Sequence, residues 1–163
     1  MEKMEINIYE AKDLLYNMLN VQGFNKRILG KSKSWTDSKY NMTERLGIRV
    51  GYNDDDILLM NKGLMEVAEF CYNRMLKLPS ECIDSTIYAA YVSKQLKELR
   101  EIIKLPYLRE KYTSMAKGTF SSKLTNKPNR HGKPNRFSEN DIAEINNGIK
   151  SFAELFASLT LTL

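Results

Sequence analysis

Apolar residues recur every three or four positions along most of this chain, and this period constrains the fold more than any other feature. The spacing matches one face of an α-helix, which has about 3.6 residues per turn. It predicts a short amphipathic helix over residues 7–20 and two long helices over residues 54–78 and 84–104. We therefore expect a mainly α-helical protein.

The C-terminal region has the most regular stripe. It follows Ser138, a residue type that favours the N-cap position of a helix. The pattern predicts an amphipathic helix, followed by an alternating LTLTL tail with strand character. Such a helix either packs on its own core or binds a neighbouring subunit. The residues that would bind a partner are Ile142, Ile145, Ile149, Phe152, Phe156 and Leu159.

Only a few residues separate the two long predicted helices, and Pro79 ends the first. Short connections place consecutive helices antiparallel. We expect the core to be an antiparallel hairpin of residues 54–78 and 84–104, with the N-terminal helix packed against it and Pro106 breaking the second helix. Residues 30–53 show no sustained period, which predicts a loop with a short strand near residues 48–52.

Residues 117–137 interrupt the helical pattern with two prolines, two glycines and no acid. Proline favours extended backbone, and the segment has little apolar surface to bury. We therefore expect a basic extended arm. The chain then divides into a helical core (1–116), the arm (117–137), and a C-terminal amphipathic helix with its tail (138–163). The length of 163 residues suits one domain with an appended arm.

The net charge of +5 is distributed unevenly. Residues 24–52 contain seven basic residues and two acids, and residues 111–136 contain seven basic residues and no acid. The remainder of the chain is therefore acidic. Local concentrations of positive charge attract polyanions even when the total charge is modest.

The two basic stretches indicate binding of nucleic acid, because Lys and Arg neutralise phosphates and exposed aromatic rings stack on unpaired bases. We expect non-catalytic, sequence-tolerant binding to a single strand or to a duplex backbone, within a larger assembly or outside one. The residues expected to contact phosphate are Lys31, Lys33, Lys127, Arg130, Lys133 and Arg136, and those expected to stack are Trp35 and Phe120.

An assembly function is the alternative interpretation. The basic arm and the C-terminal helix would then embrace a neighbouring subunit or another protein, as in a ring, a virus-like lattice or an inhibitor. A basic arm that is simply solvated is a third interpretation.

The sequence contains no complete catalytic motif. Gly30, Lys31 and Ser32 resemble the end of a phosphate-binding loop, but the first glycine of that motif is replaced by Asn25. Cys71, Cys82 and the single histidine, His131, lack the spacing of zinc ligands. The acids at 54–56 suit the start of a helix, where Asn53 or Asp54 would be the cap. We therefore expect no catalytic residue, no metal and no cofactor.

The sequence also bears on location. No apolar run approaches the roughly 18 residues of a membrane-spanning helix, and no secretory leader pattern opens the chain. Two cysteines suit reduced, buried thiols better than a disulfide framework. We expect a protein of the cytoplasm, or of a particle assembled there. Its partners would be nucleic acid, protein subunits or copies of the same chain, and not a membrane.

Overall fold

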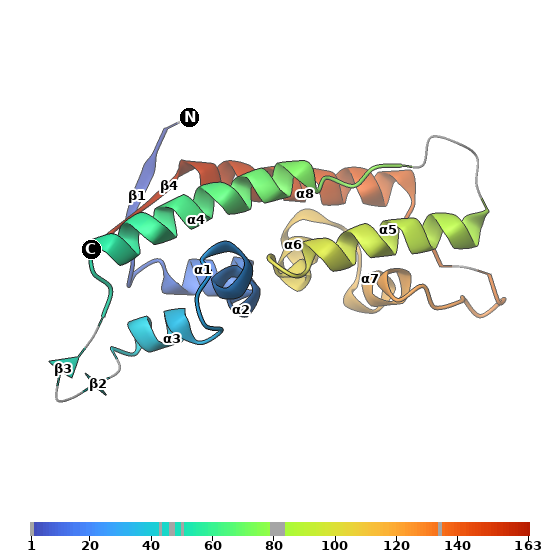
Figure 1. Ribbon diagram of the computed structural model, residues 1–163. Coiled ribbons are helices and arrows are strands. Elements are labelled where there is room, and N and C mark those ends of the chain that lie inside the picture. Colours follow the sequence, from blue (N-terminus) through green and yellow to red (C-terminus); the bar gives the residue numbers. More distant parts are fainter. Residues whose placement is uncertain (1, 43, 46–47, 50, 79–83, 134) are drawn as a thin grey trace.

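The computed structural model describes residues 2–42, 44–45, 48–49, 51–78, 84–133 and 135–163 (Figure 1). The fold is mainly helical, as predicted. The elements in chain order are β1 (Met4–Asn7), α1 (Lys12–Met18), α2 (Val21–Gly23), the π-helical turn η1 (Phe24–Ile28), α3 (Trp35–Tyr40), β2 (Glu44–Arg45), β3 (Ile48–Arg49), α4 (Asp54–Asn73), α5 (Ser85–Leu99), α6 (Leu105–Tyr112), α7 (Lys117–Leu124), α8 (Glu139–Ser158) and β4 (Leu159–Thr162).

The long helices α4 and α8 run antiparallel and form the upper layer of the molecule (Figure 1). Both begin with a capping box. The Asn53 side chain accepts a hydrogen bond from the Asp56 N–H at 2.8 Å, and Asp56 accepts one from the Asn53 N–H at 3.1 Å. Ser138 and Asp141 make the same exchange in α8. Reciprocal caps satisfy amides that have no partner inside the helix. The predicted caps at 53 and 138 are therefore confirmed.

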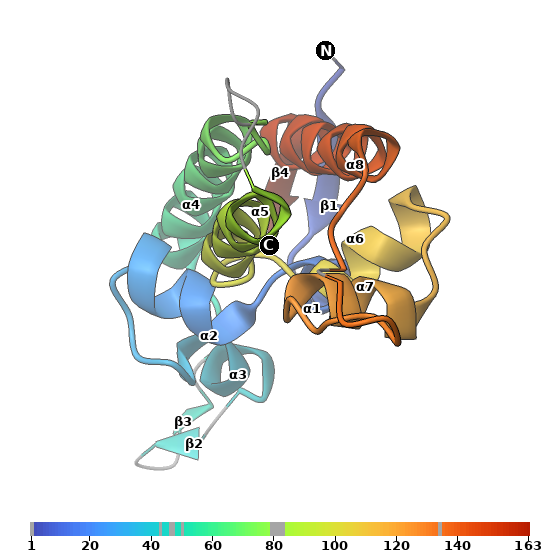
Figure 2. The same ribbon diagram turned by 90° about the vertical axis from the view of Figure 1, so that its right-hand side faces the viewer.

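The remaining helices form a lower layer in two groups (Figure 2). The α1–α3 group lies beneath one end of the upper layer, and α5, α6 and α7 lie beneath the other. A short antiparallel bridge between Leu19 and Ile103 joins the groups. Gly23 permits the two groups to approach each other next to this bridge, because a Cβ atom at residue 23 would lie 1.8 Å from the carbonyl oxygen of Glu101.

The antiparallel hairpin of residues 54–78 and 84–104 remains a prediction. The principal partner of α4 is α8 rather than α5, and residues 79–83 lie outside the described residues. Helix α4 ends at Asn73, and α5 begins only at Ser85. The Gln95 side chain of α5 hydrogen-bonds the main chain of Lys77, in the segment that follows α4. The second long helix ends earlier than predicted, at Leu99, and Pro106 does not break it but lies in the first turn of α6.

The N-terminal helix begins later than predicted. Residues 4–7 instead form β1, which pairs in parallel with β4 in the register Met4 opposite Leu159. The Asn7 side chain then accepts a hydrogen bond from the Tyr9 N–H at 2.9 Å, which starts a turn, and the helix begins at Lys12. The strand character of the tail is confirmed. The apolar stripe of this region is also buried as expected, at Ile8, Ala11, Leu15 and Met18.

The predicted loop at residues 30–53 contains the short helix α3. Its two aromatic residues account for this, because Trp35 and Tyr40 place their rings 5.8 and 5.0 Å from the ring of Tyr52 in edge-on contacts. Such pairs stabilise a helix too short to persist alone. The strand expected near residue 48 is present as β3, which pairs with β2.

The prediction of an extended arm is wrong for residues 117–124, which form the helix α7. Phe120 explains the difference. It is 5 % exposed, and its ring meets that of Phe137 edge-on at 5.4 Å. The aromatic pair supplies the buried surface that the segment lacks when it is considered alone.

The C-terminal stripe faces its own chain. Its members Ile142, Ile145, Ile149, Phe152, Phe156 and Leu159 are all buried. They pack mainly toward α4 and α6, and Phe152 contacts the rings of Tyr107 and Tyr112. Gly148 allows α6 to approach, since a Cβ atom there would lie 2.9 Å from Tyr112. The expectation that these six residues bind a partner is therefore contradicted by their burial in the home core.

Two asparagines fasten the upper layer at both ends. Asn61 of α4 accepts from the Leu161 N–H at 2.7 Å and donates to the Leu161 carbonyl at 3.0 Å. Asn146 of α8 makes the same pair with Leu76, at 2.7 and 3.0 Å. Each amide therefore satisfies both main-chain groups of a residue beyond the end of the opposite helix.

Replacing Asn146 with alanine should lower the free energy of unfolding by about 2–3 kcal/mol, because it leaves the N–H and carbonyl of the buried Leu76 without partners. Urea denaturation followed by circular dichroism measures the change. The matched control is Asn147→Ala on the exposed side of the same helix, which should change stability by less than about 0.5 kcal/mol. Equal effects of the two substitutions would contradict this role of Asn146.

Candidate functional site

The first basic loop, residues 30–34, is folded around a buried asparagine. The Asn25 side chain donates to the Lys33 carbonyl at 2.9 Å and to the Thr36 hydroxyl at 3.0 Å. The main-chain carbonyl of Asn25 accepts from the Lys31 N–H at 2.8 Å, and Gly30 adopts a positive φ of 64°. These bonds fix the loop backbone, while the side chains of Lys31 and Lys33 remain exposed. Asn25 is 0 % exposed, so it positions the loop and does not reach a ligand.

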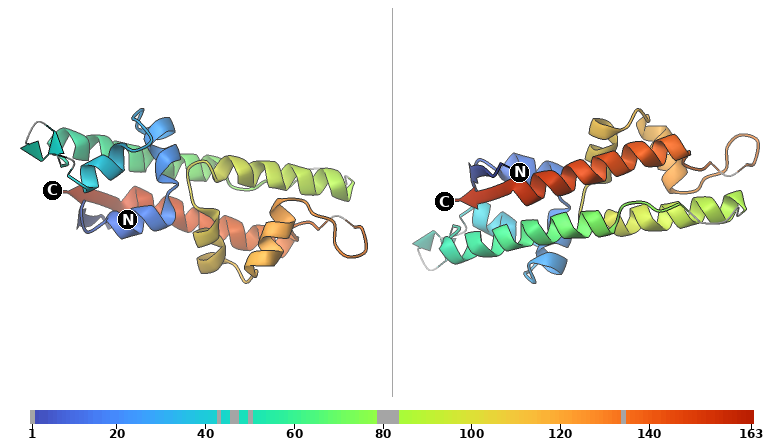
Figure 3. Two further views of the ribbon diagram at one scale, coloured as in Figure 1. Left: turned by 90° about the horizontal axis from the view of Figure 1, so that it is seen from below. Right: turned by 90° about the horizontal axis from the view of Figure 1, so that it is seen from above.

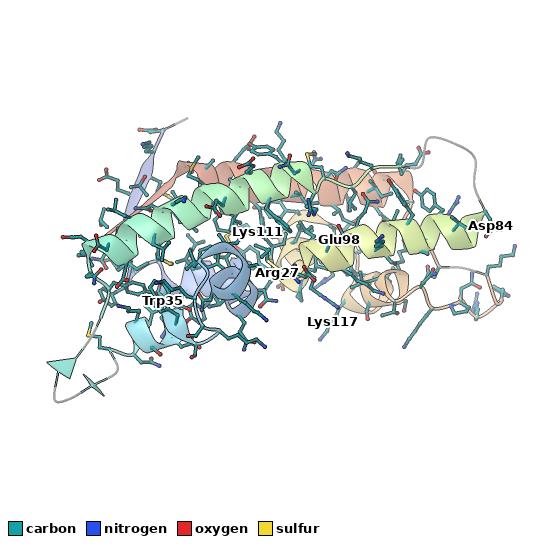
Figure 4. The ribbon with its side chains drawn as sticks, in the orientation of Figure 1. Arg27, Trp35, Asp84, Glu98, Lys111 and Lys117 are labelled. Carbon is teal, nitrogen blue, oxygen red and sulfur yellow. The ribbon has the colours of Figure 1, made fainter. Side chains whose placement is uncertain are left out.

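Trp35 lies at the base of this loop and is half-buried. The ammonium groups of Lys31 and Lys39 each lie 5.7 Å from its ring centroid. Lys39 also forms an ion pair with Asp56 at 2.6 Å, whereas Lys31 approaches only the ring. The indole of Trp35, at the start of α3, therefore interacts with two cations (Trp35 is labelled in Figure 4).

The second basic loop, residues 126–136, is organised by Asn129. Its side-chain oxygen accepts from the N–H groups of His131 at 2.9 Å and Lys133 at 3.1 Å, and its N–H donates to the Lys133 carbonyl at 2.8 Å. Gly132 has a positive φ of 72°, which closes the turn. Residues 129–133 are therefore a tight turn rather than an extended arm, and Arg130 is exposed on it.

The ends of the second loop are anchored. Arg136 lies 4.9 Å from the ring centroid of Tyr88 in α5, and Lys123 of α7 pairs with Asp141 of α8 at 2.5 Å. Burial raises the pKa of Tyr88, although the charge of Arg136 acts to lower it. Burial also acts to raise the pKa of Asp141, but hydrogen bonds from Lys123 and Ser138 outweigh it and hold that pKa below 3.8. The acid is therefore charged at neutral pH.

Helix α5 extends from one basic loop toward the other (Figures 1 and 3). Tyr88, near its start, contacts Arg136 of the second loop, and Glu101, just after its end, pairs with Arg27 of η1. The thirteen residues between these contacts correspond to about 20 Å of helix. The exposed cations Lys94, Lys97 and Arg100 recur every third residue along this stretch. The two basic loops are thus far apart. A line of cations, which we call the α5 track, extends from the second loop toward η1, which precedes the first loop in the chain.

Acids near the α5 track have cationic partners. Glu98 lies 3.6 Å from Arg74, and Glu101 pairs with Arg27. These pairs are exposed and contribute little to stability. Their effect on the surface is electrostatic, because each cancels a negative charge that would otherwise repel an anion on the track.

A groove of about 400 Å³ opens beside the end of the track, between α6 and α7. Arg100, Arg109 and Lys117 outnumber its one acid, Glu110. The groove is lined by Arg100, Leu105, Pro106, Arg109, Glu110, Lys117, Phe120, Ser121 and Leu124. It therefore combines apolar walls with a cationic rim.

Charge separates between the two layers of the fold. Helix α4 contains five acids and one lysine, and α8 contains four acids and one lysine. The net charge of +5 therefore arises entirely outside these two helices. Both basic loops and α5 lie below them in the side view (Figure 2). The molecule is electrically polar, with an acidic upper layer and a basic lower side.

The six predicted phosphate-contacting cations are exposed: Lys31, Lys33, Lys127, Arg130, Lys133 and Arg136. In the part of the chain that the structure describes, none lies within 4.0 Å of a carboxylate oxygen. They form two groups, at opposite ends of the lower side, rather than one continuous patch (Figure 1). Phe120 is only 5 % exposed, and it lines the groove between α6 and α7 rather than projecting from the surface.

Residues with catalytic chemistry lie apart from one another. Cys71 is buried, which raises the pKa of its thiol to about 12, and Cys82 lies outside the described residues. His131 is exposed and accepts a hydrogen bond from Arg130 at 3.3 Å. Among the described residues, no three potential metal ligands cluster. None of the described helices has the length and apolar character needed to cross a membrane.

Comparisons with known proteins give no family assignment. The sequence matches no protein-family model, no curated protein and no solved structure. Function must therefore be inferred from the geometry and charge described above.

The pair of Lys123 and Asp141 positions α7, and through it the second basic loop. Asp141→Asn should lower the free energy of unfolding at pH 7 by about 1–2 kcal/mol, because it removes the ion pair and weakens the cap of α8. The pKa of Asp141 is lowered by folding, so its contribution is complete above about pH 5 and is lost as the pH falls through the folded-state pKa.

Chemical denaturation of both proteins at several pH values measures this contribution. The difference between wild type and Asp141→Asn should be constant above about pH 5 and should shrink below about pH 4. Glu139→Gln, an exposed acid in the same first turn, is the matched control and should show a smaller effect. A difference that grows on acidification would contradict the assignment.

Proposed function

We propose that this protein binds nucleic acid without catalysis and without base selectivity, through phosphate contacts on its basic lower side. The observation that carries the proposal is the set of six exposed cations without carboxylate partners in the described chain, opposite an acidic layer. Unpaired surface cations are the groups that release counterions when they neutralise phosphate.

The geometry supports a backbone path from one basic loop to the other along the α5 track. Lys31 and Lys33 would hold phosphates at one end, and Arg130 and Arg136 at the other. Lys94, Lys97 and Arg100 would neutralise the phosphates between them. The acidic upper layer would orient the molecule, because it repels the polyanion while the lower side attracts it.

A single strand suits this surface better than a duplex. The groove between α6 and α7 opens next to Arg100, and its apolar walls and cationic rim fit an unpaired nucleotide. Trp35 would stack on a base only at the margin of the site, since it is half-buried and contacts Tyr52.

Binding to a labelled oligonucleotide should weaken steeply with salt. Contact with about seven phosphates, one for each cation on this path, gives a slope of roughly −4.9 for log affinity against log salt concentration with a single strand. Lys31→Gln combined with Lys33→Gln should reduce that slope by about 1.4 in magnitude, because two phosphate contacts are lost. Fluorescence anisotropy measures both quantities.

The matched control removes two exposed cations elsewhere, Lys3→Gln with Lys150→Gln, and changes the net charge by the same amount. It should leave the slope nearly unchanged. No binding to any oligonucleotide at low salt, or equal effects of the two double variants, would refute the proposal.

A further inference from the structure

The outer face of α4 carries an apolar stripe that the rest of the described chain leaves uncovered. Leu58, Met65 and Tyr72 are 68 %, 54 % and 45 % exposed. They are seven residues apart, close to two helical turns, so they lie in one line along the helix. Large apolar side chains gathered on an exposed face mark a surface of association.

A hollow adjoins this stripe. It has a volume of about 340 Å³ and opens between α4 and the end of α8. Met65, Ala68 and Tyr72 of α4 line it together with Ala157 of α8. A row of projecting side chains beside a hollow is the shape that packs against another helix, because the ridges of one helix fill the grooves of the other.

The charges on the stripe alternate with its apolar residues. Lys62 lies between Leu58 and Met65, and Glu69 lies between Met65 and Tyr72. Lys62 is exposed, and its contact with Glu66 is long, at 3.9 Å. The order along α4 is therefore apolar, cation, apolar, anion, apolar. Read in the opposite direction, this order is complementary to itself.

We propose that α4 of one molecule packs antiparallel against α4 of a second copy, forming a two-fold symmetric homodimer. An axis at Met65 places the two Met65 side chains together and sets Leu58 opposite Tyr72 of the second copy. Lys62 then lies within about 1.5 Å, along the helix axis, of the level of Glu69 of the second copy. The Met65 pair lies on the axis and occurs once, and each of the other contacts occurs twice, as a two-fold interface requires.

The alternation of Lys62 and Glu69 favours a second copy, because only a partner with the reverse order of charges places an opposite charge beside both residues. The interface lies on the acidic upper layer, and Glu66 borders it, so the Lys62–Glu69 pairs act against a general repulsion between the two acidic layers. The two basic sides would face away from each other. Dimerisation therefore does not depend on nucleic acid and is measured without it.

Sedimentation equilibrium of the full chain, at about 1–200 µM, should show a dimer that dissociates on dilution. Met65→Glu opposes two carboxylates at the axis and should raise the dissociation constant at least about 100-fold. Ile87→Glu is the matched control, because Ile87 is an exposed apolar residue on α5, at 59 %. It should leave the dimer intact, and circular dichroism should show the same helix content in all variants.

Charge reversal tests the antiparallel register. Lys62→Glu and Glu69→Lys should each weaken the dimer, because each places like charges opposite one another, and the double variant should restore it. A monomeric wild type, an equal loss with Met65→Glu and Ile87→Glu, or a double variant as weak as either single one would overturn the proposal. Failure of oligonucleotide binding has no bearing on this result, so the two proposals fail separately.

Discussion

The antiparallel contact between α4 and α8 is the interaction on which the rest of the structure depends. An apolar stripe fills the space between the helices, and an asparagine from each helix bonds the chain beyond the end of the other. A buried main-chain amide without a partner costs more free energy than its hydrogen bond contributes. Asn61 and Asn146 therefore fix the register that the apolar contacts alone would leave loose, and both groups of the lower layer pack beneath the result.

The sequence was sufficient for the elements whose signals are local. Caps at Asn53 and Ser138 and the 3.6-residue period located α4 and α8, because both signals arise within one or two helical turns. The elements it missed depend on distant partners. Residues 4–7 form a strand only because residues 159–162 are beside them, and α7 forms because Phe120 meets Phe137. Neither partner can be identified from the pattern of the segment itself.

The candidate site likewise has some features that the sequence predicts and others that it does not. The exposed cations could be located from composition, because stretches with many basic residues and few acids are usually solvated. The residues that fix the loops carrying these cations could not be located from composition. Asn25 and Asn129 are two asparagines among many, and only the backbone geometry shows that each closes a basic loop. The α5 track was not predicted either, because its importance depends on what contacts the two ends of α5.

The parallel pairing of β1 with β4 has a consequence for how the chain acquires its structure. Met4 lies opposite Leu159, so nearly the whole polypeptide forms the loop that this two-stranded sheet closes. Folding rates fall as contacting residues become more distant in sequence, because the entropy of the loop is lost before the contact is gained. During synthesis, β1 emerges long before its partner exists. Its main-chain groups must remain hydrated until β4 has left the ribosome, so this small sheet cannot form before nearly all of the described residues have been synthesised.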